Sequence, residues 1–240
     1  MSFINLFCAV NIAGYYIHIW VQNFCEIKQS KSEKILLIFL ILLAIFAFSS
    51  FVLIKNKCLF VEKVKVDKLT FENRENIVVM NINCGNVIIE LLPEVSPNAV
   101  ARFKNMIFNK EYDDVAFHRV VENFLVQAGD LEFGKKGNIN YTYIGSGKSK
   151  YSLIKPEKNK PFDFKKGSVG FAKSKNGDME DSEFFILLSD APLFEGEYTP
   201  LGNVTHGFAA LTKIKSGNKS EYVLRPDFIN SLRMLSEISN

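Results

Sequence analysis

The sequence has few cysteines and histidines, and their spacing does not suggest a metal site. The four cysteines stand at positions 8, 25, 58 and 84, without a Cys-x-x-Cys pair, and the three histidines stand at positions 18, 118 and 206. Zinc ligands usually recur at short, regular spacings, and a disulfide framework is recognised from regularly spaced cysteines in a short secreted chain. We therefore expect no metal site and no disulfide framework, and we interpret Cys84 as a small buried or hairpin residue rather than a reactive thiol.

The sequence also lacks the basic excess of a nucleic-acid-binding protein. The net charge is +3, but residues 1–34 carry +1 and residues 55–70 carry +3, which leaves −1 for residues 71–240. The glycine-rich stretch 134–147 lacks the Gly-Lys-Ser/Thr ending of a phosphate-binding loop. We therefore predict no nucleic-acid binding, and we expect the basic segment to meet anionic headgroups at a membrane surface.

One long hydrophobic run is present. Residues 35–54 comprise 18 apolar residues and two serines, with no charge. Twenty helical residues at about 1.5 Å each reach roughly 30 Å, the thickness of the hydrocarbon core of a bilayer. The run predicts a transmembrane helix that contacts the lipid bilayer.

The segments on either side of this run divide the chain further. Residues 3–20 are apolar but are interrupted by two asparagines and a histidine, and no basic cluster precedes them, which fits a cleaved signal peptide poorly. A second span, a helix lying on the surface and an extension caused by too early a start codon remain open for the N-terminal segment 1–34. We interpret 55–70 as a basic tether and expect the folded domain at 71–240.

The pattern of the domain favours β-structure. Two β-branched runs, 77–82 and 86–92, flank Asn83-Cys84-Gly85 and predict a hairpin, and Ser96-Pro97 begins an amphipathic helix that continues to Asn109. Short apolar segments follow between glycines, at 115–121, 124–130, 168–172, 184–189 and 195–204, then a short helix at 207–214 and a last strand at 228–235 that could close the sheet. Many short strands with few helices indicate a closed or nearly closed β-barrel.

Two longer motifs are recognisable. YDDVAFHRVVENFLVQAGD (112–130) and GSVGFAKSKNGDMEDSEFFILLSDAPLFEGEYTPLGNV (167–204) resemble a cyclophilin-type peptidyl-prolyl cis-trans isomerase of the bacterial kind, and the resemblance runs from about Val78 to Leu235. It implies a mainly β fold, a closed eight-stranded antiparallel barrel capped by two α-helices, here preceded by the transmembrane helix. The strand pattern by itself also indicates a closed or nearly closed β-barrel.

The reaction that the resemblance implies requires few catalytic groups. Rotation about an X-Pro amide crosses a barrier of about 18–20 kcal/mol, because it breaks amide resonance. An apolar slot that grips the proline ring and a fixed donor aimed at the amide nitrogen stabilise the twisted state without a nucleophile, a metal or a cofactor. The resemblance makes Arg119 the catalytic donor and His118 a hydrogen-bonding wall of the pocket.

The resemblance also implies the substrate-binding residues. Phe124, Leu125, Phe185 and Phe194 match the slot, Gln127 the contact to the substrate backbone, Ala172 and Lys173 the peptide groove, and Tyr198 the pocket mouth. Two positions depart from the family. Glu183 stands where a glutamine is usual, either pairing with Arg119 in the empty site or lying at the solvent edge of the groove. Leu193 stands where tight cyclosporin binders have tryptophan, so we expect weak cyclosporin binding at most.

The sequence therefore predicts a membrane-anchored isomerase that acts on proline-containing polypeptide clients and assists their folding. The alternatives are a tethered chaperone module that binds proline peptides with little turnover, in which Glu183 blunts Arg119, and a purely structural scaffold. Lysines flank the span on both sides and weaken the positive-inside rule. A single signal anchor with Lys28, Lys31 and Lys34 in the cytoplasm would place the domain on the periplasm-like face.

Overall fold

The structure, a computed structural model, describes residues 30–55, 57–173, 179–217 and 221–238. Its contacts divide the chain into two compact units, Met1–Asn56 and Lys57–Asn240. The second unit is the body. The apolar stretch 3–20 lies outside the described residues.

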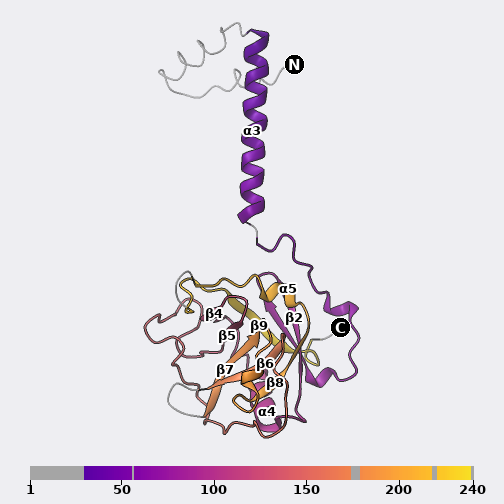
Figure 1. Cartoon of the computed structure of the whole chain (residues 1–240), viewed down its shortest axis with the longest axis vertical. Coiled ribbons are helices and arrows are strands. Elements are labelled where there is room, and N and C mark those ends of the chain that lie inside the picture. The colour runs from indigo at the N-terminus through magenta and orange to yellow at the C-terminus, as the bar shows by residue number, and fades with distance from the viewer. Residues whose placement is uncertain (1–29, 56, 174–178, 218–220, 239–240) are drawn as a thin grey trace. The chain divides into compact units, whose positions relative to one another are not determined.

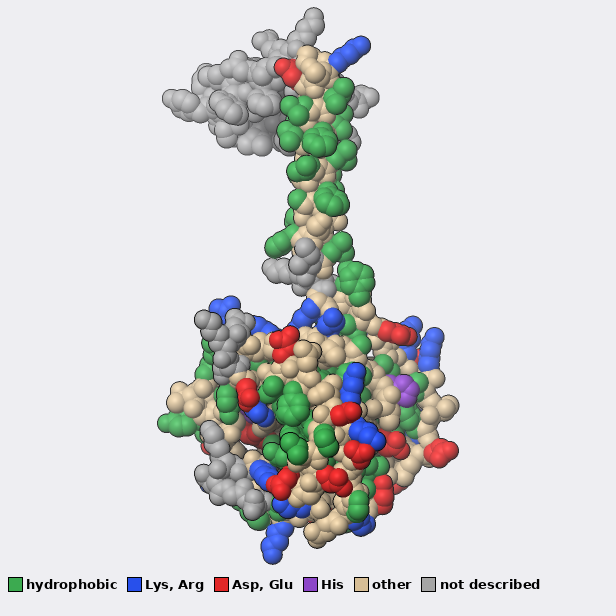
Figure 2. All heavy atoms as spheres, in the orientation of Figure 1, with side chains coloured by type: hydrophobic (Ala, Val, Ile, Leu, Met, Phe, Trp, Pro, Cys, Tyr) green, Lys and Arg blue, Asp and Glu red, His purple; other side chains and the backbone are tan. Residues whose placement is uncertain are grey.

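The described part of the first unit is one long helix, α3 (Lys31–Lys55). Its leucine, isoleucine and phenylalanine side chains between Ile35 and Leu53 are exposed, and Figure 2 shows green side chains along the helix. The stretch Lys31–Leu53 is long and apolar enough to cross a membrane, a criterion that a signal sequence also meets. The helix includes the whole of the predicted span 35–54.

The body is built on one antiparallel sheet of nine strands (Figure 1). The strands are β1 (Ile77–Ile82), β2 (Gly85–Leu91), β3 (Val115–Ala116), β4 (Arg119–Val121), β5 (Leu125–Ala128), β6 (Ser168–Lys173), β7 (Glu180–Leu187), β8 (Pro200–His206) and β9 (Phe228–Met234). Their order is β3-β9-β1-β2-β8-β6-β7-β5-β4. The predicted hairpin is confirmed, because β1 pairs with β2 from Ile82 opposite Gly85 onward.

The prediction of a closed eight-stranded barrel is wrong, because the sheet has nine strands and two free ends. The end strands β3 and β4 are the two short parts of the segment 115–121, and they do not pair with each other. Loops cover their outer edges instead: the Ala116 N–H donates to the Gly134 carbonyl at 2.9 Å, and the Val120 N–H donates to the Glu221 carbonyl at 2.7 Å. Strand β9, expected to close the barrel, lies between β1 and β3. The result is a sheet curled into a half-barrel.

Two α-helices accompany the sheet. Helix α4 (Pro97–Phe108) forms as predicted and buries Ala99, Val100, Phe103, Met106 and Ile107 in the main core. Helix α5 (Phe208–Leu211) is shorter than the predicted 207–214. Short 3-10 turns lie at Val66–Lys68, Arg74–Asn76 and Pro192–Phe194. Helix α4 thus packs into the main core, and the alternate residues of β5 and β7 form a separate apolar cluster.

The segment 55–70, interpreted as a basic tether, contacts the body from Lys57 onward. A disulfide joins Cys58 to Cys84, and Val61 is buried in the main core. Lys57 forms an ion pair with Asp227, with 2.5 Å between Nζ and Oδ2. The body therefore begins near Lys57 rather than Phe71. Cys84 lies in the hairpin turn and is buried, as interpreted, but the expectation of no disulfide missed its bond to a cysteine 26 residues earlier.

Candidate active site

Strand pairing brings the key side chains of the site into one row. Arg119 on β4 lies opposite Gln127 on β5, and Gln127 lies opposite Phe185 on β7. Phe185 in turn lies opposite Gly170 on β6. Side chains of directly opposite residues share a face of the sheet. Residues from four strands therefore meet on one surface.

The alternation of side chains along β5 and β7 separates this surface from the main core. Val126, Phe184 and Ile186 point into the main core, whereas Leu125 and Phe185 belong to a second apolar cluster on the opposite face. This second cluster, the slot, buries Leu125, Phe164, Ala172, Phe185, Leu187 and Ala191, with Phe124, Phe194 and Tyr198 half-buried around it. The slot brings together every apolar and aromatic residue that the sequence assigned to it.

Aromatic rings line the slot edge to face. The ring of Phe185 lies 5.4 Å from that of Phe194 and 5.3 Å from that of Tyr198, centroid to centroid, both nearly perpendicular. A Cβ at Gly170 would stand 2.7 Å from Cζ of Phe185, so only glycine leaves room for this ring. Sequence reasoning missed Phe164, whose side chain is buried and tilted against Phe185. The sequence indicates a role for Phe164 only through its i, i+2 spacing from Phe162, in a segment without clear periodicity.

Arg119 is held from two sides. Its Nε donates to Oε2 of Glu221 at 2.7 Å, and its Nη2 lies 2.6 Å from the same oxygen. Its Nη1 donates to Oε1 of Gln127 at 3.1 Å. Glu221 was missed by the sequence analysis, because it lies about 100 residues after the motif in a segment without a recognisable pattern. These contacts fix the plane of a guanidinium that stays charged at any ordinary pH.

Glu183 acts on Arg119 only through Gln127. The Nε2 of Gln127 donates to Oε2 of Glu183 at 2.7 Å, so the amide presents its acceptor oxygen to Arg119. The expected pair between Glu183 and Arg119 does not form, because Glu221 takes that place. The solvent-edge alternative does not hold either, since the Glu183 side chain is only 15% exposed.

His118 lies beneath a loop beside this network. Its side chain is 1% exposed, and its Nε2 stands 3.3 Å from Oε2 of Glu183 without the alignment of a hydrogen bond. The ring of Tyr222 lies nearly parallel to it, 6.4 Å away. Asp130 holds the covering loop by accepting four backbone N–H groups, from Glu132, Phe133, Gly145 and Gly147. His118 is therefore buried beside the site, and among the described residues its two ring nitrogens lack the hydrogen bond that the predicted hydrogen-bonding wall would make.

Charged and exposed residues surround the mouth of the slot. Lys173 forms an ion pair with Glu197 at 3.0 Å and lies 5.1 Å above the ring centroid of Tyr198. Leu193 is 87% exposed beside the half-buried Phe194. Within the part of the chain that the structure describes, no group of three or more His, Cys, Asp or Glu side chains could hold a metal ion.

Comparison with known proteins bears on this arrangement. The family model described as "Cyclophilin type peptidyl-prolyl cis-trans isomerase/CLD" matches residues 77–234. A probable peptidyl-prolyl cis-trans isomerase of Brucella suis is 39% identical over 159 residues, which cover 65% of this chain and 80% of that protein. A peptidyl-prolyl cis-trans isomerase of Helicobacter pylori is 31% identical over 144 residues, covering 59% and 82%.

Solved structures agree in fold. The chain resembles a cyclophilin-type isomerase of Cryptosporidium parvum, crystallised in the presence of the dipeptide Ala-Pro, with a TM-score of 0.57 and 26% identity over 68% of this chain and 99% of that one. It also shares its fold with the cyclophilin AquaCyp293 of Hirschia baltica, with a TM-score of 0.58 and 19% identity over 70% of this chain and 76% of that one.

Proposed function

The chain belongs to the cyclophilin-type peptidyl-prolyl cis-trans isomerases and is an enzyme of that class, and we propose that Arg119 and the slot carry its reaction. The observation that supports this assignment is the row Arg119, Gln127 and Phe185 across three paired strands. It places one directional cation at the border of an apolar cluster. The substrate class is the X-Pro bond of a protein chain, and a relative of this fold was crystallised with a proline dipeptide.

The slot binds the proline ring, and the guanidinium stabilises the twisted amide. Leu125, Phe185 and Phe194 hold the apolar proline ring, so that the preceding residue remains free to turn. As the amide twists, its nitrogen loses conjugation and gains a lone pair that accepts a hydrogen bond. A donor placed for that lone pair binds the twisted state more tightly than either planar isomer, which lowers the barrier.

Arg119 keeps donors for this task. A guanidinium carries five N–H groups. Glu221 accepts the Nε N–H and lies in ion-pair contact with Nη2, and Gln127 accepts one N–H of Nη1, so N–H groups on Nη1 and Nη2 remain for the substrate. The same contacts hold the guanidinium in place before the substrate arrives, which reduces the cost of organising the site during the reaction.

We test the assignment by replacing the donor. Arg119→Ala in the full chain should lower kcat/KM for a proline peptide about a hundredfold, the typical effect of losing one fixed donor to a transition state, or about 3 kcal/mol. Arg102→Ala removes a guanidinium from α4 and serves as the matched control. Equal turnover by the wild type and Arg119→Ala, with both folded by circular dichroism, would contradict the assignment.

We also propose that α3 anchors the enzyme in a membrane as a single span, with the body on the periplasm-like side. Helix α3 is long and apolar enough to cross a bilayer. The disulfide between Cys58 and Cys84 follows the helix closely in sequence, and such bonds persist in oxidising compartments and are rare in the cytosol. Clients would then be proline-containing chains that have crossed the membrane. Since Leu193 rather than tryptophan stands at the mouth, cyclosporin should bind weakly at most.

A further inference from the structure

A cavity lies on the body, and none of the residues that line it belongs to the slot. Its volume is about 600 Å³, and it opens between the segment that follows α3 and the junction of β8 with α5. The charged and ring-bearing side chains that line it are Glu62, Lys63, Lys65, Lys68, His206 and Phe208. None of them belongs to the network around Arg119. The isomerase reaction therefore leaves the cavity unexplained.

The wall of this cavity is fixed by contacts with the sheet. The disulfide between Cys58 and Cys84 and the buried side chain of Val61 hold the chain just before the wall. Nδ2 of Asn86, on β2, donates to the Val64 carbonyl within the wall at 3.3 Å. The three lysines are therefore displayed on a segment that is held against the sheet.

The lining of the cavity carries a net positive charge, with three lysines and one acidic residue. Among the described residues, no carboxylate lies within ion-pair distance of Lys63, Lys65 or Lys68. Glu62 is the one acidic residue in the lining. Three ammonium groups around an open cavity suit a phosphate, which offers several oxygen acceptors.

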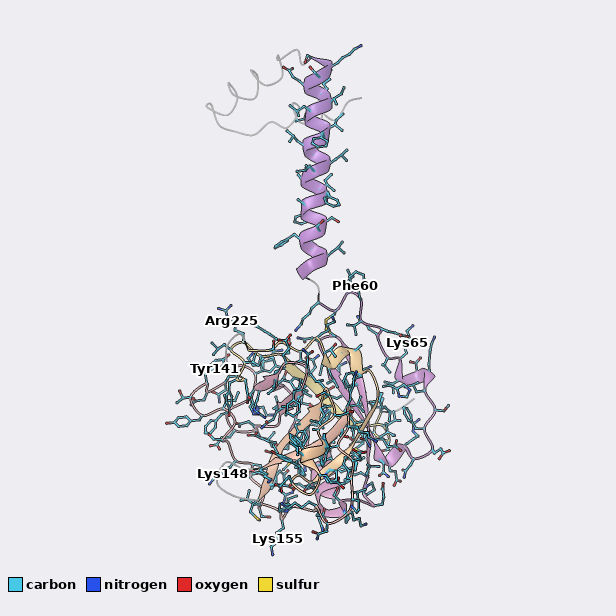
Figure 3. All side chains as sticks on the ribbon, in the orientation of Figure 1. Phe60, Lys65, Tyr141, Lys148, Lys155 and Arg225 are labelled. Atoms are coloured by element: carbon cyan, nitrogen blue, oxygen red, sulfur yellow. A yellow bond between two sulfur atoms is a disulfide. The ribbon has the colours of Figure 1, made fainter. Side chains whose placement is uncertain are left out.

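The position in the sequence indicates where this phosphate comes from. Lys63 follows the end of α3 at Lys55 by eight residues. Between them Phe60 is 90% exposed, and Figure 3 shows its side chain standing out from the body, on the segment that continues to Lys65. Exposed apolar side chains next to lysines are typical of segments that rest on an anionic lipid surface.

We propose that this cavity binds the phosphate of an anionic phospholipid headgroup through Lys63, Lys65 and Lys68. The proposal rests on the anchoring of α3 in a membrane. The lipid would fix the orientation of the body on the bilayer, and so the direction in which the slot faces.

The test compares two bilayers. The full chain is reconstituted in nanodiscs of phosphatidylcholine alone or with phosphatidylglycerol, and hydrogen exchange of the amides in 62–69 is measured. Phosphatidylglycerol should slow the exchange of the wild type about tenfold. The combined variant Lys63→Gln/Lys65→Gln/Lys68→Gln should lose this protection. The matched control Lys110→Gln/Lys148→Gln/Lys155→Gln, which removes three exposed lysines outside the cavity, should retain it.

The proposal would be overturned by equal exchange in the two bilayers or by equal loss of protection in both lysine variants. It would also be overturned if inorganic phosphate, added to nanodiscs of phosphatidylcholine alone, gave the same protection, because the cavity would then bind a free anion. Extraction of the same membranes with alkaline carbonate tests the anchor separately. Release of the chain by carbonate contradicts the anchor itself. Retention without an effect of phosphatidylglycerol contradicts only the lipid site.

Discussion

At the scale of single residues, the carboxylate that contacts Arg119 is Glu221 and not Glu183, which the sequence analysis had considered. The resemblance assigned Arg119, Gln127 and Phe185 to the site, and strand pairing brings these three residues together. Glu221 could not be found in this way, because its contact with Arg119 arises from a loop that covers the edge of β4. A contact between distant segments leaves no local pattern in the sequence.

Glu221 should act as a positioning residue for Arg119. Glu221→Gln removes the charge that holds the guanidinium plane, so we expect kcat to fall about fivefold with little change in KM, since exposed ion pairs contribute up to about 1 kcal/mol. The wild-type kcat should fall with added salt, because salt screens the pair, while Glu221→Gln should respond less. Peptide isomerisation assays across a salt series measure both effects. Glu72→Gln, at an exposed position, is the control, and a salt response shared by all three proteins would argue against the role.

Glu180 should make the stability of the body depend on pH. Its side chain is fully buried on β7, and burial raises the pKa of its carboxyl to about 7, against a partial opposing effect of Thr199. Because the folded state keeps a proton that the unfolded state releases near its usual pKa of 4.5, stability is highest at low pH and falls as pH rises towards 7. Glu180→Gln should remove this fall, on the order of 3 kcal/mol.

Urea unfolding of the full chain in detergent, at about pH 5 and about pH 8, measures this difference in the free energy of unfolding. Glu94→Gln, a change of the same kind at an exposed position, should keep the wild-type dependence on pH. A parallel pH dependence in wild type and Glu180→Gln would show that the carboxyl does not titrate as described.

At the scale of elements, local patterns predicted the hairpin of β1 and β2 and the helix α4, because each has the periodicity of its own secondary structure. The open ends of the sheet were not predictable in the same way. They depend on a break at Phe117 and His118 that divides one apolar run into β3 and β4. The disulfide was missed for a similar reason: Cys58 and Cys84 meet only after the tether folds back on the hairpin.

The disulfide should stabilise the segment 57–69 rather than the active site. Closing a loop of 26 residues stabilises the folded state by about 3 kcal/mol in the chain-entropy model. Cys58→Ser/Cys84→Ser should therefore expose the lysines of this segment to trypsin much faster than in wild type, while kcat/KM on a proline peptide stays nearly unchanged. Wild type treated with a reductant should behave like the variant. Equal cleavage rates for the oxidised wild type and the variant would contradict this role.

At the scale of the whole molecule, the body separates two tasks between two faces of one sheet. The main core on one face provides stability, and the slot on the other provides the binding surface. Figure 2 shows acidic and basic side chains interspersed on the body, in keeping with its nearly neutral charge. Under the proposed anchoring of α3, we therefore expect the segments around this helix, rather than the surface of the body, to decide the membrane side.

The lysines at 28, 31 and 34 should hold the N-terminal side of α3 in the cytoplasm and place the body outside. We expect protease added to intact spheroplasts to digest the body of the wild type, because positive charges before a span favour retention on the cytoplasmic side. Changing these three lysines to glutamine should leave a larger share of the body protected, since five lysines that follow the span would then favour the opposite orientation. Lys110→Gln/Lys148→Gln/Lys155→Gln, which alters equal charge within the body, should leave the digestion unchanged. Protection of the wild-type body, while a control protein on the outer face is cut, would place the isomerase in the cytoplasm, where the disulfide between Cys58 and Cys84 would be reduced.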